Sequence, residues 1–454
     1  MSSIEEGFMK ICVFLVSFVL FFLSLSVNAK GNFITLSDIH FDPYASCIKT
    51  QKDCPVLNKL IDADVSEWAT IFENMGTNGI SHYGQDTSNA LLESTLSELV
   101  KRYDKYPPKF VIINGDFLSH NFQQAFQYFA PGKSYNLFVA KTFSYLSLRI
   151  AKAFPNSQIL PVVGNNDAFG GDYYSSPQGD FYKSLLSSNV WGPFFKGIDK
   201  VQFLQGGYYK VSPSGEPNHL IIVLNSVLFS AKAKGPSSDA ISAAATRQLH
   251  WLADTLSKAK EAHQKVWLVF HIPFGVDVYD SKATHHPVMF WSTAPVNFNK
   301  LFLDIISSYD GVIQAMITSH THDDELMVYH NMLDVFAPSI SPTHYNNPAF
   351  KEFSYDDSFT LINNETYYLN LQDSNPRWQF EYDFDKAYGN AHSMRKATLN
   401  LLSSKGAAYV EKYEKYFDAL GADPINSDDW SYYRCGIFYH EADDYQRCAL
   451  GADQ

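Results

Sequence analysis

The sequence has few basic residues for its length. Its 454 residues include 35 lysines and arginines against 48 aspartates and glutamates, which gives a formal net charge of −13. An acidic surface of this kind repels nucleic acid and anionic lipid, so we expect neither as a bulk partner. A small phosphorylated substrate is still compatible with the charge, because bound cations can invert the charge of one cleft.

Cysteine is also scarce, with five residues in the chain. Cys12 falls in the N-terminal segment, and the other four form two close pairs. Cys47–Cys54 and Cys435–Cys448 are therefore the expected disulfides among three possible pairings. Neither pair has the short spacing of a zinc knuckle, which argues against a metal site made of cysteine alone.

The N-terminus carries a run without charge, residues 11–27, directly after Lys10. Val27-Asn28-Ala29 then offers the small or aliphatic residues of a cleavage site. The run is short for a membrane span. We therefore expect a cleaved signal peptide, a secreted, periplasmic or lysosome-like location, and no stable membrane insertion after cleavage. A retained membrane anchor is the alternative.

No internal repeat or low-complexity segment is visible, and 46% hydrophobic with 18% charged residues is an ordinary globular balance. Short apolar runs that are typical of buried strands occur at 33–36, 110–114, 159–163, 220–224, 266–270 and 312–318. Helical stretches lie between them at 89–103, 135–153 and 240–262. This alternation predicts an α/β fold, in which ligands bind beyond the carboxyl ends of the strands. A looser region begins near Asn363, with one last strand expected at 367–371.

Polar residues with metal-binding chemistry follow five of these runs. In chain order they are Asp38, His40, Asp116, Asn165, His271, His320 and His322. A single carboxylate can bridge two cations, imidazoles suit zinc, iron or manganese, and an amide oxygen adds a neutral ligand. In two-metal sites the ions lie about 3.5–4 Å apart, and a metal-bound water can ionise to hydroxide near pH ~7. The set predicts two divalent ions, zinc first and iron or manganese as alternatives, and a hydrolase that uses metal-bound hydroxide.

These motifs resemble those of the calcineurin-like metallophosphoesterases. The resemblance rests on Asp38-Ile39-His40, Gly115-Asp116, Gly164-Asn165-Asn166-Asp167, His271 and His320-Thr321-His322. A narrower resemblance is to the acid sphingomyelinase-like phosphodiesterases and endopolyphosphatases. It rests on residues 38–44, on His120 four residues after Asp116, and on residues 339–342 followed by 346–348. The match runs from about Phe33 to Tyr388.

The resemblance implies a four-layer α/β/β/α core with two mixed sheets. It implies one metal held by Asp38, His40 and His322, and a second held by Asn165, His271 and His320, with Asp116 bridging both. The family usually has a histidine at the position of Asn166, so the resemblance leaves the proton donor open. His120 matches a second family histidine near the phosphate and is our candidate for catalysis, although it could simply hydrogen-bond a loop. His285 and His286 are further candidates, or an exposed loop pair.

The expected organisation is a signal peptide at 1–29, a catalytic domain at 30–365 and a helical C-terminal subdomain at 366–454 with the second disulfide. The leading function is hydrolysis of phosphodiesters in a small substrate such as a nucleotide or a lipid headgroup. A phosphomonoesterase, polyphosphatase or nucleotide hydrolase is the first alternative, and a non-catalytic binding protein the second. Asp172-Tyr173-Tyr174 is a candidate for shaping the substrate pocket. His344 is a candidate for supporting the metal-binding residues, or a plain loop histidine. Asn364-Glu365-Thr366 forms a glycosylation sequon.

Overall fold

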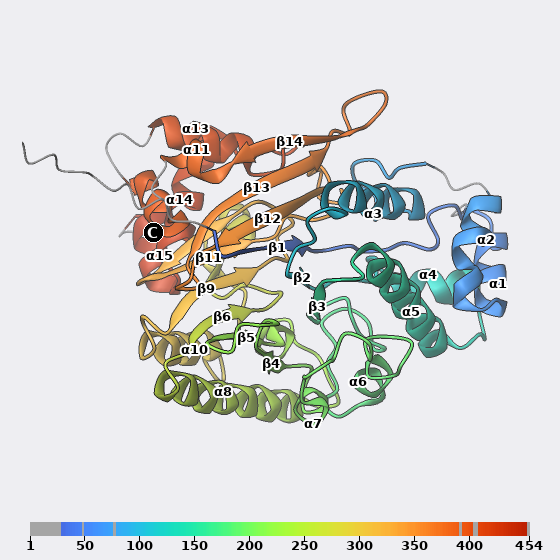
Figure 1. Cartoon of the computed structure of the whole chain (residues 1–454), viewed down its shortest axis with the longest axis horizontal. Helices are drawn as coiled ribbons and strands as arrows, with labels where there is room; N and C mark the ends of the chain where they lie inside the picture. Colours follow the sequence, from blue (N-terminus) through green and yellow to red (C-terminus); the bar gives the residue numbers. More distant parts are fainter. Residues whose placement is uncertain (1–28, 48–49, 76–78, 390–392, 403–406, 452–454) are drawn as a thin grey trace, which may run out of the picture.

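The computed structural model describes residues 29–47, 50–75, 79–389, 393–402 and 407–451. The expected signal peptide therefore lies outside the described residues, apart from Ala29. The described chain forms two six-stranded sheets that pack face to face between helices (Figure 1). This confirms the predicted α/β class and the two mixed sheets. None of the helices in the described ranges is both long enough and apolar enough to cross a membrane.

The first sheet has the strand order β14-β13-β12-β1-β2-β3. Its strands are β1 (Gly31–Leu36), β2 (Phe110–Ile113), β3 (Gln158–Pro161), β12 (Ala349–Tyr355), β13 (Leu361–Leu369) and β14 (Trp378–Asp383). β1, β2 and β3 are parallel, with Phe33 opposite Phe110 in the register. β12, β13 and β14 continue the sheet in antiparallel pairs.

The second sheet has the order β10-β11-β9-β6-β5-β4. Its strands are β4 (Tyr209–Val211), β5 (His219–Val223), β6 (Lys265–Val269), β9 (Ile313–Thr318), β10 (Leu326–Tyr329) and β11 (Met332–Phe336). β5, β6, β9 and β11 run parallel, and β4 and β10 are antiparallel edge strands. A small two-stranded sheet joins β7 (Val276–Asp277) and β8 (Val288–Met289).

The two sheets share a core because successive side chains of a strand point to opposite faces. In β5, Ile221 belongs to the cluster between the sheets, whereas Leu220 packs with the helices on the outer face. Aromatic rings close the inner space, and the ring of Phe33 in the first sheet lies 4.9 Å from that of Trp267 in the second. The strand runs are apolar throughout because both of their faces are covered.

Helices cover the outer faces of the sheets, as Figure 1 shows for α8 and α10 beside the second sheet. The α-helices are α1 (Pro55–Asp62), α2 (Trp68–Met75), α3 (Asn89–Tyr103), α4 (Phe122–Phe129), α5 (Tyr135–Ala153), α6 (Asp180–Leu185), α7 (Lys200–Leu204), α8 (Ser238–Glu261), α9 (Val278–Thr284), α10 (Phe298–Ser307), α11 (Phe384–Tyr388), α12 (Met394–Thr398), α13 (Ala407–Tyr416), α14 (Trp430–Phe438) and α15 (Ala442–Ala449). α3 and α5 have the predicted bounds. α8 begins two residues earlier than expected, because Ser237 caps it by accepting from the backbone N–H of Ala240.

The chain after Asn363 is more regular than its sequence indicates. Residues 363–366 lie within β13, and the expected last strand at 367–371 is the end of that longer strand. The expected domain boundary at residue 365 thus falls inside a strand of the first sheet. Asn364 is buried, with 1% of its surface exposed, and its side-chain amide donates to Thr366 Oγ1. The sequon is therefore inaccessible in the folded protein.

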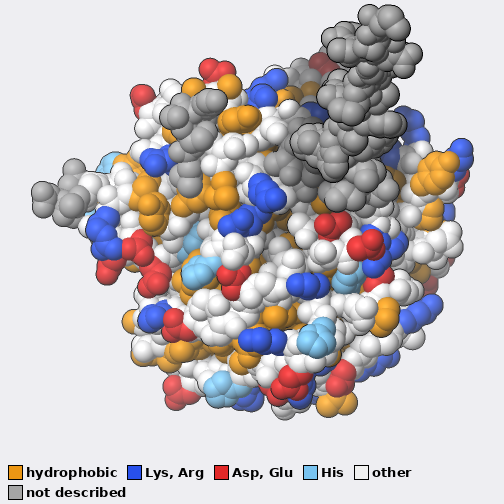
Figure 2. All heavy atoms as spheres, turned by 60° about the vertical axis from the view of Figure 1, so that its left-hand side comes forward, with side chains coloured by type: hydrophobic (Ala, Val, Ile, Leu, Met, Phe, Trp, Pro, Cys, Tyr) orange, Lys and Arg blue, Asp and Glu red, His pale blue; other side chains and the backbone are white. Residues whose placement is uncertain are grey.

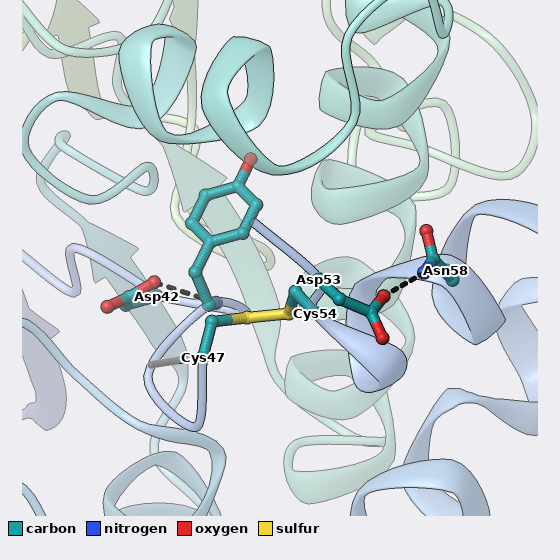
Figure 3. The surroundings of a disulfide bond; sticks show 6 residues. Asp42, Cys47, Asp53, Cys54 and Asn58 are labelled. Carbon is teal, nitrogen blue, oxygen red and sulfur yellow. Dashed lines mark hydrogen bonds between the residues drawn. A yellow bond between two sulfur atoms is a disulfide. The ribbon is translucent and has the colours of Figure 1, made fainter. Parts of the chain in front are cut away.

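Both expected disulfides are present. The Cys47–Cys54 bond ties the loop that follows β1 to the residue that precedes α1, and Figure 3 shows it beside the hydrogen bond from Asn58 to Asp53. The Cys435–Cys448 bond joins α14 to α15. The acidic excess of the chain forms no single patch on the face in Figure 2, where acidic and basic side chains are interspersed.

Candidate functional site

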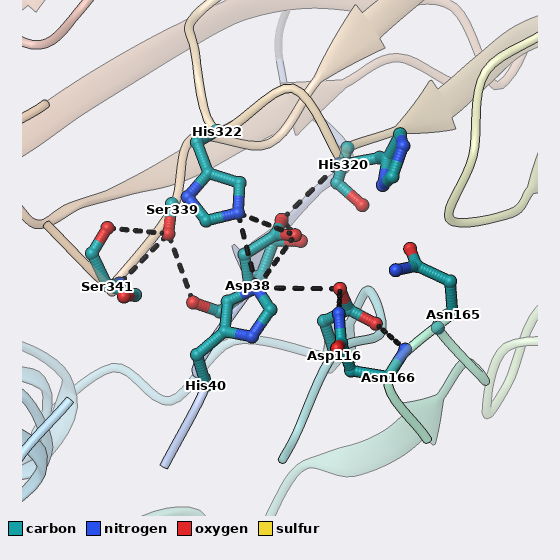
Figure 4. A network of polar contacts seen from close by, with 12 residues as sticks. Asp38, His40, Asp116, Asn165, Asn166, His320, His322, Ser339 and Ser341 are labelled. Carbon is teal, nitrogen blue, oxygen red and sulfur yellow. Dashed lines mark hydrogen bonds and ion pairs between the residues drawn. The ribbon is translucent and has the colours of Figure 1, made fainter. Parts of the chain in front are cut away.

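The predicted metal-binding residues meet where parallel strands of both sheets end. β1, β2 and β3 bring residues from the first sheet, and β6 and β9 bring residues from the second. Figure 4 shows most of them pointing toward one another. The structure places all seven together: Asp38, His40, Asp116, Asn165, His271, His320 and His322.

One oxygen of Asp116 lies between two histidines. Its Oδ2 atom is 3.4 Å from His40 Nε2 and 3.3 Å from His271 Nε2. His271 Nε2 is also 3.0 Å from Asn165 Oδ1. A single carboxylate oxygen therefore faces both halves of the cluster, which is the geometry that a ligand shared by two cations needs.

Asp38 and His322 complete the half that contains His40. His322 Nε2 lies 3.2 Å from His40 Nε2 and 3.5 Å from Asp38 Oδ1. That oxygen of Asp38 is buried and accepts no hydrogen bond from any described residue. An unsatisfied buried carboxylate oxygen beside imidazole nitrogens is costly unless a cation binds there. The residues present therefore fit a divalent metal centre.

Hydrogen bonds orient the candidate ligands. His40 Nδ1 lies 3.0 Å from the carbonyl of Leu118, and His271 Nδ1 lies 2.8 Å from the carbonyl of Asn114. A carbonyl only accepts, so these contacts place the proton on Nδ1 and turn the Nε2 lone pair toward the centre. Asp172 accepts from the side-chain amide of Asn165 at 2.9 Å, which turns the amide oxygen toward His271. Its place in the sequence gave no hint of this role.

The backbone is unusual at the same positions. Five of the seven residues have positive φ angles, a region that residues with a Cβ rarely adopt: Asp38 46°, His40 40°, Asp116 53°, His320 79° and His322 74°. Such conformations cluster at functional sites. At Gly115, with φ 91°, an added Cβ would come within 2.6 Å of His271 Nδ1, so the Gly-Asp motif requires its glycine.

The electrostatics of the cluster favour cations. Burial lowers the pKa of His40, but Asp38 and Asp116 outweigh it and raise the pKa to about 9. For His271 the same carboxylates also overcome burial and raise the pKa to about 9. Without a metal, both rings are protonated on both nitrogens at neutral pH. A divalent ion that binds at Nε2 would displace the proton there.

His120 lies beside the cluster rather than within its hydrogen bonds. Its ring stacks on that of His40, with centroids 4.0 Å apart, and its side chain is 35% exposed. Its Nδ1 atom and its backbone N–H each lie 2.9 Å from an oxygen of Asp86. Sequence reasoning missed Asp86, because nothing in a single sequence connects this loop residue to His120.

Asn166 and the remaining candidate histidines lie in different places around the cluster. Asn166 faces Asp116, donating to Oδ1 from its backbone and to Oδ2 from its side chain, both at 2.8 Å. His285 and His286 are exposed at the end of α9, and the described residues that line the cavity at the site do not include them. His344 does line it, with its ring 4.4 Å from that of His322.

A cavity of about 760 Å³ opens on the cluster. Its lining includes Tyr173, whose hydroxyl is 3.3 Å from His320 Nε2, and segments that follow β8 and α13. Of the described lysines, Lys232 and Lys282 line it. The lining carboxylates other than Asp116 are Asp172, Asp277, Asp280, Asp323, Glu325 and Asp423.

Several known proteins are similar in sequence to this chain. Sphingomyelinase phosphodiesterase D of Dictyostelium discoideum is 28% identical over 420 residues, 87% of this chain and 89% of that protein. Cyclic GMP-AMP phosphodiesterase SMPDL3A of Rattus norvegicus is 28% identical over 62% of this chain and 64% of its own length. Acid sphingomyelinase-like phosphodiesterase 3b of Homo sapiens is 25% identical over 80% of this chain and 78% of its own. The profile of the calcineurin-like phosphoesterases matches residues 32–324. The chain therefore belongs to the calcineurin-like phosphoesterase family.

Proposed function

We propose that this protein hydrolyses phosphodiesters at a centre of two divalent metal ions. The observation that carries the proposal is the shared position of Asp116 Oδ2 between His40 and His271. The three similar proteins described above are all named phosphodiesterases, which supports diesters over other phosphate esters.

Asp38, His40 and His322 would hold one ion, and Asn165, His271 and His320 would hold the other, with Asp116 placed to serve both. When bound, such ions activate water as a nucleophile near neutral pH and neutralise charge on the reacting phosphate. Imidazole and carboxylate donors suit zinc best, with iron and manganese as the other metals that this donor set accepts. Elemental analysis should find about two ions per chain.

The charge of the cavity favours a substrate with one phosphate charge. Among the described residues, six acidic side chains besides Asp116 line it with Lys232 and Lys282. Burial raises the pKa of Asp323 well above its ordinary value and that of Glu325 to about 7, so the negative charge of the lining is smaller than six. Lys282 is paired with Asp429 at 3.0 Å and Lys232 with Asp280 at 3.8 Å. A polyphosphate or nucleoside triphosphate extending from the metals would meet these carboxylates, and like charges at short range repel. A diester carries a single negative charge, which the metal centre itself neutralises.

His120 supplies the proton that the leaving oxygen needs. It lines the cavity and stacks on a metal-binding histidine, so it stands beside the reacting phosphate. A positioned imidazole typically contributes ~10²–10⁴-fold to such a step. His120→Ala should therefore slow an ester with an alkyl leaving group far more than a nitrophenyl ester, which needs little protonation, and should leave the metal content unchanged.

A substrate panel on purified, metal-loaded protein tests the proposal. It compares bis(4-nitrophenyl) phosphate, 4-nitrophenyl phosphate, a nucleoside triphosphate, polyphosphate and sphingomyelin. Fastest turnover of the two diesters supports the proposal. Preference for the monoester or for the polyanions would assign another phosphate bond, and bound metal without any turnover would indicate a binding protein.

We also propose that the protein is exported before it acts. The uncharged run at 11–27 and the two disulfides support this, since disulfides persist in oxidising compartments. N-terminal sequencing of protein from its native host should find a mature chain that begins near Lys30. An intact Met1 on membrane-bound protein would favour the anchor instead.

A further inference from the structure

The carboxylate of Asp86 contacts His120 at two points. Asp86 lies in the loop before α3, and its side chain is 11% exposed. Oδ2 accepts from the backbone N–H of His120, and Oδ1 lies 2.9 Å from Nδ1 of the same residue. One carboxylate therefore fixes both the backbone and the ring of His120, which a simple loop contact would not require.

The loop that carries Asp86 is itself tied to the metal-binding segment. The backbone N–H of Thr87 donates to the carbonyl of His40 at 3.0 Å, and the backbone N–H of Asp42 donates to the carbonyl of Thr87 at 2.8 Å. Ser81 Oγ donates to the carbonyl of Asp86, and Ser341 Oγ lies 3.3 Å from its Oδ1. Asp86 is thus held by hydrogen bonds, and its loop is tied to the segment that carries His40.

These contacts determine which nitrogen of His120 can act. Nδ1 points at a carboxylate, which only accepts, so it carries the proton. Burial would raise the pKa of Asp86, but the hydrogen bond with His120 and the nearby His40 lower it, so the group is a carboxylate at neutral pH. Nε2 is left for the cavity, where a ring nitrogen of His120 lies within 4.8 Å of ligand atoms of His40 and His322.

We propose that Asp86 is the positioning residue of His120: it holds the imidazole by Nδ1 so that Nε2 faces the leaving oxygen of the substrate. This inference rests on the proposed role of His120 in phosphodiester hydrolysis. Asp86 touches neither metal nor substrate. It acts by keeping the ring in one orientation with one arrangement of protons, as buried carboxylates beside catalytic histidines do.

Asp86→Asn is the sharpest test, because it changes the hydrogen-bonding pattern and little else. The amide oxygen of the variant can still accept from the backbone of His120, but its NH₂ group then faces Nδ1 and opposes the proton there. We expect roughly 10²-fold slower turnover of an alkyl diester, within the range of a lost general acid. Turnover of bis(4-nitrophenyl) phosphate should fall by less than about threefold, because a nitrophenolate leaves with little need of a general acid. The metal content should not change.

A double-mutant comparison separates positioning from folding. In a His120→Ala background, Asp86→Asn should have almost no further effect on either substrate, because the group it positions is gone. Glu216→Gln is the matched control: Glu216 is another buried carboxylate on a histidine, 2.6 Å from His219 Nδ1, outside the cavity lining. It should slow both substrates by the same factor, if it slows either.

Three results would overturn the inference. Asp86→Asn could slow both diesters equally, it could slow them further in the His120→Ala background, or it could strip the metal. Each would make Asp86 a structural anchor of its loop. If instead the wild-type protein turns over neither diester, the proposed function fails first and the inference falls with it.

Discussion

Replacing Lys351 with methionine should destabilise the fold by about 3–5 kcal/mol, the usual cost of removing one partner from a buried ion pair. Lys351 lies on β12 with its side chain fully buried and contacts the carboxylate of Asp324, which is 3% exposed. Its Nζ also donates to the carbonyl of Phe336 at 3.0 Å, and Tyr382 donates to Asp324 at 2.8 Å. Asp324 follows His322 by two residues, so the pair also supports the loop that carries this predicted metal-binding residue.

The magnitude comes from the charge that the substitution leaves behind. Methionine has a stem of similar length, so little volume is lost. Burial raises the pKa of Asp324 even with Lys351 and Tyr382 in place, which shows how poorly this position tolerates a carboxylate. Without Lys351 the group must stay charged and unpaired or take up a proton, and either outcome costs stability.

Equilibrium unfolding in urea measures the effect, with metal in excess for every protein. Lys300→Met is the matched control, because Lys300 pairs with Asp304 at 2.8 Å while both side chains are more than half exposed. An exposed pair contributes at most about 1 kcal/mol. Removing both charges with Lys351→Met and Asp324→Leu should recover much of the loss. A Lys351→Met protein that is as stable as Lys300→Met would refute this reasoning.

Three further outcomes are expected. Asp116→Asn should lose most bound metal and nearly all hydrolysis, measured by elemental analysis and turnover, because it removes the one carboxylate oxygen that faces both halves of the site. Burial lowers the pKa of His440 to about 4, although its bond to the Val328 carbonyl opposes this. The folded pKa lies below the unfolded value of 6.5, so the stability that the neutral ring contributes is fully present above pH 6.5. Roughly 3 kcal/mol of the free energy of unfolding is lost as the pH falls to 4. Denaturant unfolding of His440→Gln should show a smaller loss of stability over the same pH range. Asn364 should carry no glycan, and the intact mass of secreted protein should equal that of the polypeptide, because the side chain is buried in β13.

The sequence was most informative for strands that are covered on both faces of their sheet. The parallel strands are short, continuous apolar runs, and their positions and the polar residues after them could be predicted. β13 could not, because Asn363, Asn364 and Glu365 look like a loop, although Asn364 and Thr366 are buried and hydrogen-bonded to each other. Polar residues inside a strand depend on partners from other segments, which local patterns do not reveal.

The site divides in the same way. Its seven predicted metal-binding residues follow strands, so the carboxyl edges of the sheets bring them together. Asp86 follows no strand, and its contact with His120 depends on how the loop before α3 folds back onto the segment after β1. For His285 and His286 the sequence left a catalytic role and an exposed loop pair open, and the structure places both residues exposed at the end of α9.

The far side of the cavity has a consequence for how this enzyme could change over time. Part of its wall comes from Phe417, residues 422–425, Tyr433 and Gly436, all beyond residue 324, where the family match ends. The seven predicted metal-binding residues all precede residue 324, whereas this part of the wall follows it; the rest of the lining, such as Tyr173 and Lys232, lies within the family match. Substitutions in residues 417–436 would change the shape of this part of the cavity without replacing any of the seven predicted metal-binding residues. Grafting that stretch from a relative should transfer substrate preference without transferring the sensitivity to leaving groups.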